Sequence, residues 1–137
     1  MGRFSVKISL ANYVDVIRAE SGDIPETDVR RFEVEGVVDT GAAQLVLPAH
    51  AAEALGLQEA WSAKVTYADG HTQQRPVVKN VWLSLNGRDS VFSAVVEPGR
   101  KTALVGAIVM EALDLVVDCV TQQLQPRDPT MMLTEIE

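Results

Sequence analysis

The sequence Val37-Val38-Asp39-Thr40-Gly41-Ala42-Ala43 places one carboxylate in a turn between two apolar runs. Residues 32–36 alternate apolar and polar side chains before this turn, and residues 44–48 are mostly apolar after it. Both patterns are typical of strands, so we expect the turn to present Asp39 from a rigid sheet. A fixed position of this kind suits a carboxylate that takes part in chemistry.

The residues that follow Asp39 also suit a titrating site. Thr40 can hydrogen-bond a neighbouring backbone group, and Gly41 lets another segment of the chain approach closely. Ala42 is small, so it leaves space beside the carboxylate. We therefore interpret Asp39 as the candidate catalytic residue and Thr40, Gly41 and Ala42 as the support of its turn.

One aspartate is not enough for hydrolysis of a peptide bond, the chemistry that such a turn indicates. Hydrolysis of a peptide bond without a metal uses two aspartates that share a proton, one as base and one as acid. No other aspartate in the chain is followed by Ser or Thr and then by Gly. We expect the second carboxylate from a second copy of the chain, because a two-fold axis brings equivalent residues together.

Length and composition limit the classes to which the protein can belong. A chain of 137 residues with 47% hydrophobic residues favours one domain with one core. A formal net charge of -7 argues against binding to a nucleic-acid backbone. No export signal stands at the start, and no apolar run approaches the roughly 20 residues that span a bilayer. A single cysteine excludes an internal disulfide framework, so we expect a cytoplasmic protein without nucleic-acid or membrane partners.

The rest of the chain divides into short runs with strand character. Residues 4–10 and 13–19 are expected to form a hairpin or two consecutive strands, and an acidic connector follows at residues 20–28. Residues 48–56 predict a short helix with proline in its first turn and glycine at its end. Two further hairpins are expected, one around residues 86–89 and one closing the domain.

A further hairpin is predicted between two β-rich runs, residues 61–67 and 72–85. The joint carries Asp69 and Gly70, a pair that strongly favours a tight turn. Gly70 permits a positive backbone angle and motion, while Tyr67 and His71 stand where they can approach a ligand from the strand ends. The hairpin is either a flap over a bound peptide, with Asp69 at its tip, or an ordinary surface hairpin.

A second constellation is an apolar strand at residues 102–106 that ends at glycine before a short helix at residues 108–113. Gly106 lets the strand end pack closely behind the Asp39 turn. Leu104 and Val105 would then surround the rear of the carboxylate with low-dielectric material. The alternative is a buried strand-to-helix joint without any role in chemistry.

These features together resemble the retropepsin-like, single-domain aspartic peptidases of clan AA over residues 30–125. Residues 37–42 resemble the catalytic signature, residues 68–70 a flap tip, and residues 104–106 the apolar-apolar-glycine motif. The resemblance implies a mostly β fold with two short helices: an acid protease barrel with one lobe per chain. It also implies a protease domain at residues 1–125, followed by a tail or dimer-interface segment at residues 126–137.

The same resemblance implies how the residues share the work. Members of the family are homodimers in which the threonines, here Thr40, interlock beneath the aspartates and a peptide or protein substrate lies under the flaps. Ala107 stands where retroviral members often have a basic residue that braces the dimer. His50 and His71 lack the spacing of metal ligands, so we expect no metal and no cofactor.

Three functional hypotheses follow from the sequence. The first is an aspartic endopeptidase that cleaves extended peptides with one water activated by an Asp39 pair across a homodimer. The second is a catalytically silent homodimer of the same fold that binds a peptide or a partner. The third is a structural homodimer in which Asp39 is only a buried turn carboxylate.

Overall fold

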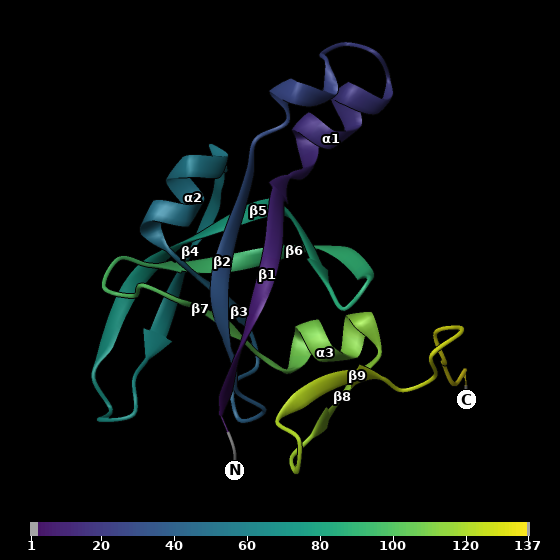
Figure 1. The fold of residues 1–137 in the computed structure, drawn as a ribbon. Coiled ribbons are helices and arrows are strands. Elements are labelled where there is room, and N and C mark those ends of the chain that lie inside the picture. The colour runs from purple at the N-terminus through teal and green to yellow at the C-terminus, as the bar shows by residue number, and fades with distance from the viewer. Residues whose placement is uncertain (1–2, 137) are drawn as a thin grey trace.

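The computed structural model describes residues 3–136. Residues 1, 2 and 137 lie outside the described residues. The first two belong to the predicted protease domain, residues 1–125, and the last to the predicted tail, residues 126–137. Within residues 3–136 the chain forms nine strands, three short α-helices and one 3-10 turn (Figure 1). The strands are β1 (Phe4–Asn12), β2 (Arg31–Val38), β3 (Leu45–Pro48), β4 (Glu59–Thr66), β5 (Thr72–Leu85), β6 (Arg88–Glu97), β7 (Ala103–Val105), β8 (Leu115–Asp118) and β9 (Gln123–Pro126). The helices are α1 (Tyr13–Glu20), α2 (Ala49–Leu55), α3 (Ala107–Leu113) and the 3-10 turn η1 (Glu26–Asp28).

Six strands close into a barrel. The sheet order is β1-β2-β7-β3-β6-β5-β4, and an additional pairing of β1 with β5 joins the two ends of the six-strand ring. β4 stands outside the ring and pairs with β5 as a hairpin. The pairs β2–β7 and β3–β6 are parallel, whereas the other pairs in the ring are antiparallel. This mostly β, single-barrel architecture confirms the predicted fold class.

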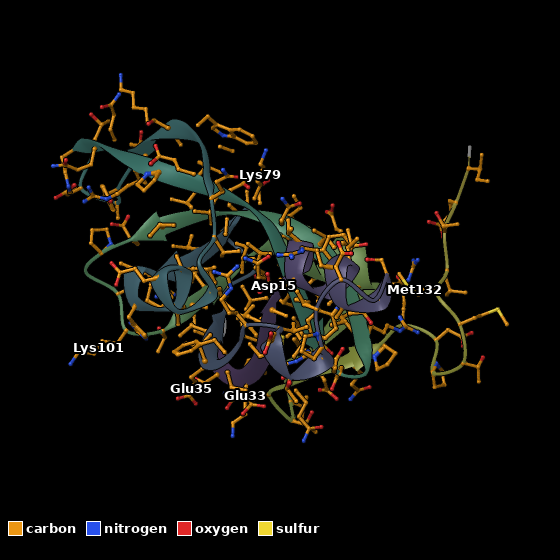
Figure 2. All side chains as sticks on the ribbon, turned by 90° about the horizontal axis from the view of Figure 1, so that it is seen from above. Asp15, Glu33, Glu35, Lys79, Lys101 and Met132 are labelled. Carbon is orange, nitrogen blue, oxygen red and sulfur yellow. The ribbon has the colours of Figure 1, made fainter. Side chains whose placement is uncertain are left out.

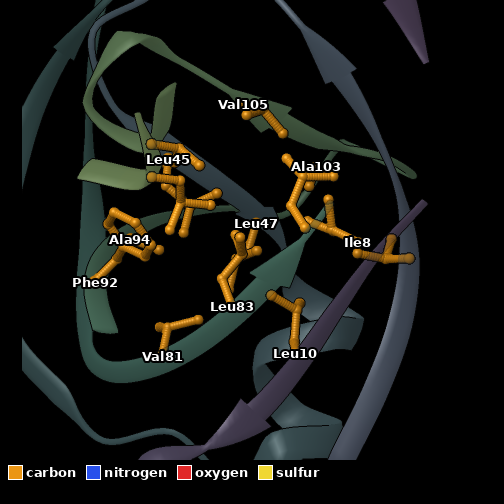
Figure 3. Close-up of a cluster of buried hydrophobic side chains, with 14 of the residues drawn as sticks. Ile8, Leu10, Leu45, Leu47, Val81, Leu83, Phe92, Ala94, Ala103 and Val105 are labelled. Carbon is orange, nitrogen blue, oxygen red and sulfur yellow. The ribbon is translucent and has the colours of Figure 1, made fainter. Parts of the chain in front are cut away.

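The core of the barrel is aliphatic. Side chains such as Ile8 and Leu83 are fully buried where strands of the ring face one another (Figure 3). On β2, Val34 points into the core, whereas Glu33 and Glu35 are exposed and lie at the periphery of the molecule (Figure 2). This alternation is the period of two on which the strand prediction depended.

Residues 13–19 were predicted as a strand, and this prediction is wrong: they form α1. The side chain of Asn12 accepts a hydrogen bond from the backbone N–H of Asp15 (3.1 Å) and donates to the carbonyl of Leu55 (2.9 Å). The buried carboxylate of Asp15 receives Nε, Nη2 and the backbone N–H of Arg30 at 2.8 to 3.0 Å. A helix cap and a long-range ion pair thus override the β-branched local pattern.

The two predicted helices are present, so residues 3–136 form three α-helices rather than two. α2 begins directly after Pro48 and ends at Gly56, whose φ of +62° is in the left-handed region. A Cβ at Gly56 would lie 2.0 Å from Nη1 of Arg30, so a side chain there would collide with the partner of Asp15. α3 begins directly after Gly106, as expected.

The chain beyond the barrel packs beside α3. β8 and β9 form a two-stranded sheet, and residues after β9 are bound by the nearly buried carboxylate of Asp114. This carboxylate accepts hydrogen bonds from Nε of Arg127 (2.7 Å) and from the backbone N–H of Leu133 (2.7 Å). None of the helices in residues 3–136 has the length and apolar character needed to cross a membrane.

Candidate active site

Asp39 is held at the end of β2 by backbone groups. Its own N–H donates to the carbonyl of Val105 (3.1 Å), and its Oδ1 accepts the N–H of Gly41 (3.0 Å). The carbonyl of Asp39 accepts the N–H of Ala42 (3.1 Å), which closes the turn. The side chain of Asp39 is 18% exposed, so the carboxylate reaches solvent from a fixed position.

The joint between β7 and α3 is bonded to the back of this turn. Ala107 and Ile108, the first residues of α3, donate their N–H groups to the carbonyls of Ala42 (2.8 Å) and Ala43 (3.0 Å). These bonds satisfy helix N–H groups that have no partner within the helix. A Cβ at Gly106 would lie only 2.3 Å from the carbonyl oxygen of Gln44, so the close approach requires glycine.

Leu104 and Val105 lie behind the turn because β7 runs between β2 and β3. Leu104 is level with Val37 and Val105 with Val38 in the parallel pairing with β2. Val105 is fully buried, and Leu104 is partly buried. The structure thus brings the predicted residues 104–106 together with residues 39–42, although they are more than 60 positions apart in the chain.

Arg3 is a neighbour of Asp39 that the sequence did not indicate. Its Nη2 lies 2.8 Å from Oδ2 of Asp39, and the arginine side chain is 70% exposed. In a single chain, therefore, both oxygens of the carboxylate have donors: Gly41 on one and Arg3 on the other. No local motif marks Arg3, because the contact spans 36 positions.

The hairpin between β4 and β5 is well ordered by its own hydrogen bonds. Tyr67 donates its N–H to the carbonyl of His71 and accepts the N–H of Gly70 on its own carbonyl, both at 2.9 Å. Gly70 has a φ of +91°, as its predicted turn requires. Asp69 accepts hydrogen bonds from the backbone N–H and the ring of His71, and the backbone bond in particular lowers the pKa of this carboxyl.

A cavity of about 590 Å³ connects the Asp39 turn with this hairpin. Residues 42–44 form one wall, residues 63–66 of β4 form another, and residues 93–95 of β6 lie between them. The hairpin and the Asp39 turn also extend toward the same end of the barrel, opposite α1 (Figure 1). Within the hairpin, residues of β4 line this cavity. Asp69 and His71 bond to each other at the hairpin tip and are not among the lining residues.

Thr40 faces a different space. It is exposed and lines a second cavity of about 560 Å³ together with α3, β8 and residues 133–135. The Asp39 turn thus lies between two cavities, one lined by β4 of the hairpin and one lined by the C-terminal residues 133–135. Across residues 3–136, no group of three or more His, Cys, Asp or Glu side chains is arranged to hold a metal ion.

Comparison with known proteins identifies the family. A model of the family described as aspartyl protease matches residues 26–118, which include the Asp39 turn, the β4–β5 hairpin and Gly106. The chain belongs to the aspartyl protease family. Its fold is similar to that of EIAV protease complexed with the inhibitor HBY-793, with a TM-score of 0.55 and 13% sequence identity. That similarity covers 82% of this chain and 88% of the EIAV protease chain. It confirms that this chain has a retropepsin-like fold. None of the curated proteins matches the chain in sequence.

Proposed function

We propose that the protein is an aspartic-type endopeptidase that acts as a homodimer on extended peptides. The observation that carries the proposal is the fixed carboxylate of Asp39, bonded to Gly41 and backed by the β7–α3 joint, in a turn whose residues 42–44 line a cavity together with β4 of the hairpin. Family membership supports the same activity. The volume of the cavity is within the roughly 300 to 1,000 Å³ range of ligand pockets.

The proposed reaction needs two Asp39 side chains and one water. One carboxylate takes a proton from the water, which attacks the carbonyl carbon of the peptide bond, while the other gives its proton to the carbonyl oxygen. The tetrahedral intermediate then breaks at the C–N bond: the leaving nitrogen takes the proton that the first carboxylate removed from water, and the second carboxylate regains a proton from a hydroxyl of the intermediate as the new carboxyl group forms. Two like charges held this close share one proton rather than both ionising, which prepares the pair for this exchange.

Homodimerisation is part of the proposal because each chain supplies one Asp-Thr-Gly turn. An isologous interface at this turn would bring Thr40 and Asp39 of both chains to the two-fold axis. The exposure of Thr40 supports this arrangement, since its side chain is free to meet a second copy. A cytoplasmic location stays a prediction from the sequence.

The alternative is a catalytically silent homodimer that binds a peptide or a partner. The bond from Arg3 to Oδ2 of Asp39 favours this alternative, because it occupies an oxygen that a catalytic water would use. The endopeptidase requires this exposed arginine to turn away when the two carboxylates meet. The two functions differ in whether bound peptide is cut.

Incubation of the protein with a mixed peptide library between about pH 4 and 7 tests the proposal, with products identified by mass spectrometry. We expect cleavage by the wild-type protein and none by Asp39→Asn, and inhibition by a peptide that mimics the tetrahedral intermediate. Asp28→Asn, which makes the same change of charge in exposed η1, should cleave normally. Peptide binding without cleavage, unchanged in Asp39→Asn, would establish the silent homodimer instead.

A further inference from the structure

Three side chains tie the tip of the β4–β5 hairpin to the end of β6. The hydroxyl of Tyr67 donates to Oε2 of Glu97, and Nε of Arg75 donates to Oε1 of the same carboxylate at 2.7 Å. Nε of Arg75 also lies 3.2 Å from the hydroxyl of Tyr67. Because Tyr67 follows β4 and Arg75 belongs to β5, one carboxylate binds both sides of the hairpin.

These contacts are partly shielded from water. The side chains of Arg75 and Glu97 are 24% and 14% exposed, so their hydrogen bonds are charge-assisted and only weakly screened. The ring of Tyr67 is stacked on the ring of His71, with centroids 4.5 Å apart, and this fixes the direction of the hydroxyl. The bond to Glu97 raises the pKa of Tyr67, which keeps the hydroxyl protonated as a donor.

The bond from Tyr67 to Glu97 spans the hairpin. In the β4–β5 pairing, Ala63 lies opposite Arg75, and Tyr67 lies four residues further toward the tip. Four residues of a strand span about 13 Å, and the long side chains of Tyr67 and Glu97 cross this distance by reaching toward each other. The bond therefore ties the tip of the hairpin to the end of β6. Glu97 also lines the cavity of about 590 Å³, and Tyr67 directly follows Thr66, the last residue of β4 and another lining residue, so the bond lies at the edge of this cavity.

We propose that Tyr67, Arg75 and Glu97 form a latch that holds the hairpin closed across this cavity and thereby retains bound peptide. The latch rests on the proposed function only in that the retained ligand is a peptide substrate. Tyr67 and Glu97 are positioning residues: they act on the hairpin, and Asp39 does the chemistry. Loss of the latch leaves the hairpin open more of the time, so peptide binds more weakly while the cleavage step is preserved.

Amide hydrogen exchange of Tyr67→Phe tests the latch without any substrate. This variant keeps the ring that stacks on His71 and removes only the hydroxyl that reaches Glu97. We expect the backbone amide of Gly70 and of residue 67 to exchange at least several-fold faster than in the wild-type protein. Tyr13→Phe, at the only other tyrosine in the chain, is the matched control and should leave these amides unchanged. Unchanged exchange in Tyr67→Phe would overturn the latch.

Peptide kinetics give the second readout. Tyr67→Phe should raise KM about five- to tenfold and keep kcat within about twofold, whereas Tyr13→Phe should change neither. Glu97→Gln keeps an acceptor for the hydroxyl of Tyr67, so its KM should lie between those of the wild-type protein and Glu97→Ala. A fall in kcat at constant KM would overturn the positioning role. If the wild-type protein cleaves no peptide, the proposed function fails, and hydrogen exchange alone decides the latch.

Discussion

At the scale of single residues, the candidate site depends on two glycines, Gly106 and Gly41, that let backbone groups pack closely around Asp39. Gly106 permits the carbonyls of residues 42 and 44 to approach the β7–α3 joint, and the joint in turn bonds the Asp39 turn. Gly41 contributes an N–H to the carboxylate itself. The position of the Asp39 carboxylate is therefore set by backbone contacts, with few side chains involved.

The first prediction concerns Gly106→Ala. The added Cβ would lie 2.3 Å from one backbone carbonyl oxygen and 2.8 Å from another, and neither can move without breaking the turn. We expect a loss of about 2 to 4 kcal/mol in the free energy of unfolding, measured by chemical denaturation. Gly99→Ala is the matched control because no atom lies within 4 Å of its added Cβ, and it should cost less than about 0.5 kcal/mol. Equal stability of the two variants would contradict the steric argument.

At this scale the sequence predicted the turn but not all of its neighbours. Asp39, Gly41 and Gly106 were recognisable because each stands in a short pattern whose geometry is local. Arg3 and Glu97 were not, because Arg3 lies 36 positions from Asp39, Glu97 lies 30 positions from Tyr67, and no local pattern marks either one. Contacts of this kind depend on the closed barrel and become visible only in three dimensions.

At the scale of elements, the β-strands and hairpins followed from their patterns, whereas α1 did not. Residues 13–19 are rich in β-branched side chains, which favour strands. Their helix is fixed instead by the cap from Asn12 and by the pairing of Asp15 with Arg30 (Figure 2 labels Asp15 on α1). Tertiary hydrogen bonds thus outweighed the local preference.

A second prediction concerns the pH dependence of this polar link. The hydrogen bond from Arg30 holds the pKa of Asp15 below its ordinary value of 3.8. The ionised Asp15 carboxylate therefore stabilises the folded protein fully above pH 3.8. This stabilisation is lost as the pH falls through the pKa of Asp15 in the folded state. We expect Asp15→Asn to unfold in less urea than the wild-type protein at pH 7, with a difference that shrinks below about pH 4.

The control for Asp15→Asn is Asp28→Asn, in exposed η1. Asp28→Asn should unfold at the same urea concentration as the wild-type protein at each pH. A difference between Asp15→Asn and the wild-type protein that stays constant down to about pH 2 would show that the carboxylate charge does not support α1.

A third prediction concerns the two hairpin glycines. Gly70 (φ +91°) and Gly87 (φ +77°) both have open space where a Cβ would stand, so alanine adds a similar strain of about 1 to 2 kcal/mol at each. Gly70→Ala disturbs the hairpin over the cavity and should lower kcat/KM for peptide several-fold. Gly87→Ala lies between β5 and β6 and should leave kcat/KM unchanged. Equal effects on kcat/KM would show that the β4–β5 hairpin has no special role in peptide binding.

At the scale of the whole molecule, the barrel offers one Asp-Thr-Gly turn per chain, and the proposed enzyme needs two. The fold is compatible with a second turn from another chain, because the Asp39 turn lies at an end of the barrel and Thr40 is exposed beside it. The dimer would therefore add a second turn to a finished barrel and would not complete the barrel itself.

A fourth prediction follows for mixtures of subunits. About a tenfold excess of Asp39→Asn chains, equilibrated with wild-type chains, should lower the peptidase activity per wild-type chain about tenfold, because most wild-type chains then pair with a variant chain and such pairs hold only one Asp39 carboxylate. The same excess of Asp28→Asn chains should cause no loss. Activity that is unaffected by Asp39→Asn chains would mean that one subunit acts alone.

The pairing of β1 with two strands has a consequence for proteolytic trimming of the chain. Residues 4–11 pair with β2 and residues 9–12 pair with β5, so β1 is the strand that closes the ring. A cut before Tyr13 would release this strand and leave β2 and β5 with rows of unpaired N–H and C=O groups. Unprotected strand edges recruit other chains, so we expect a trimmed protein to aggregate rather than to gain activity.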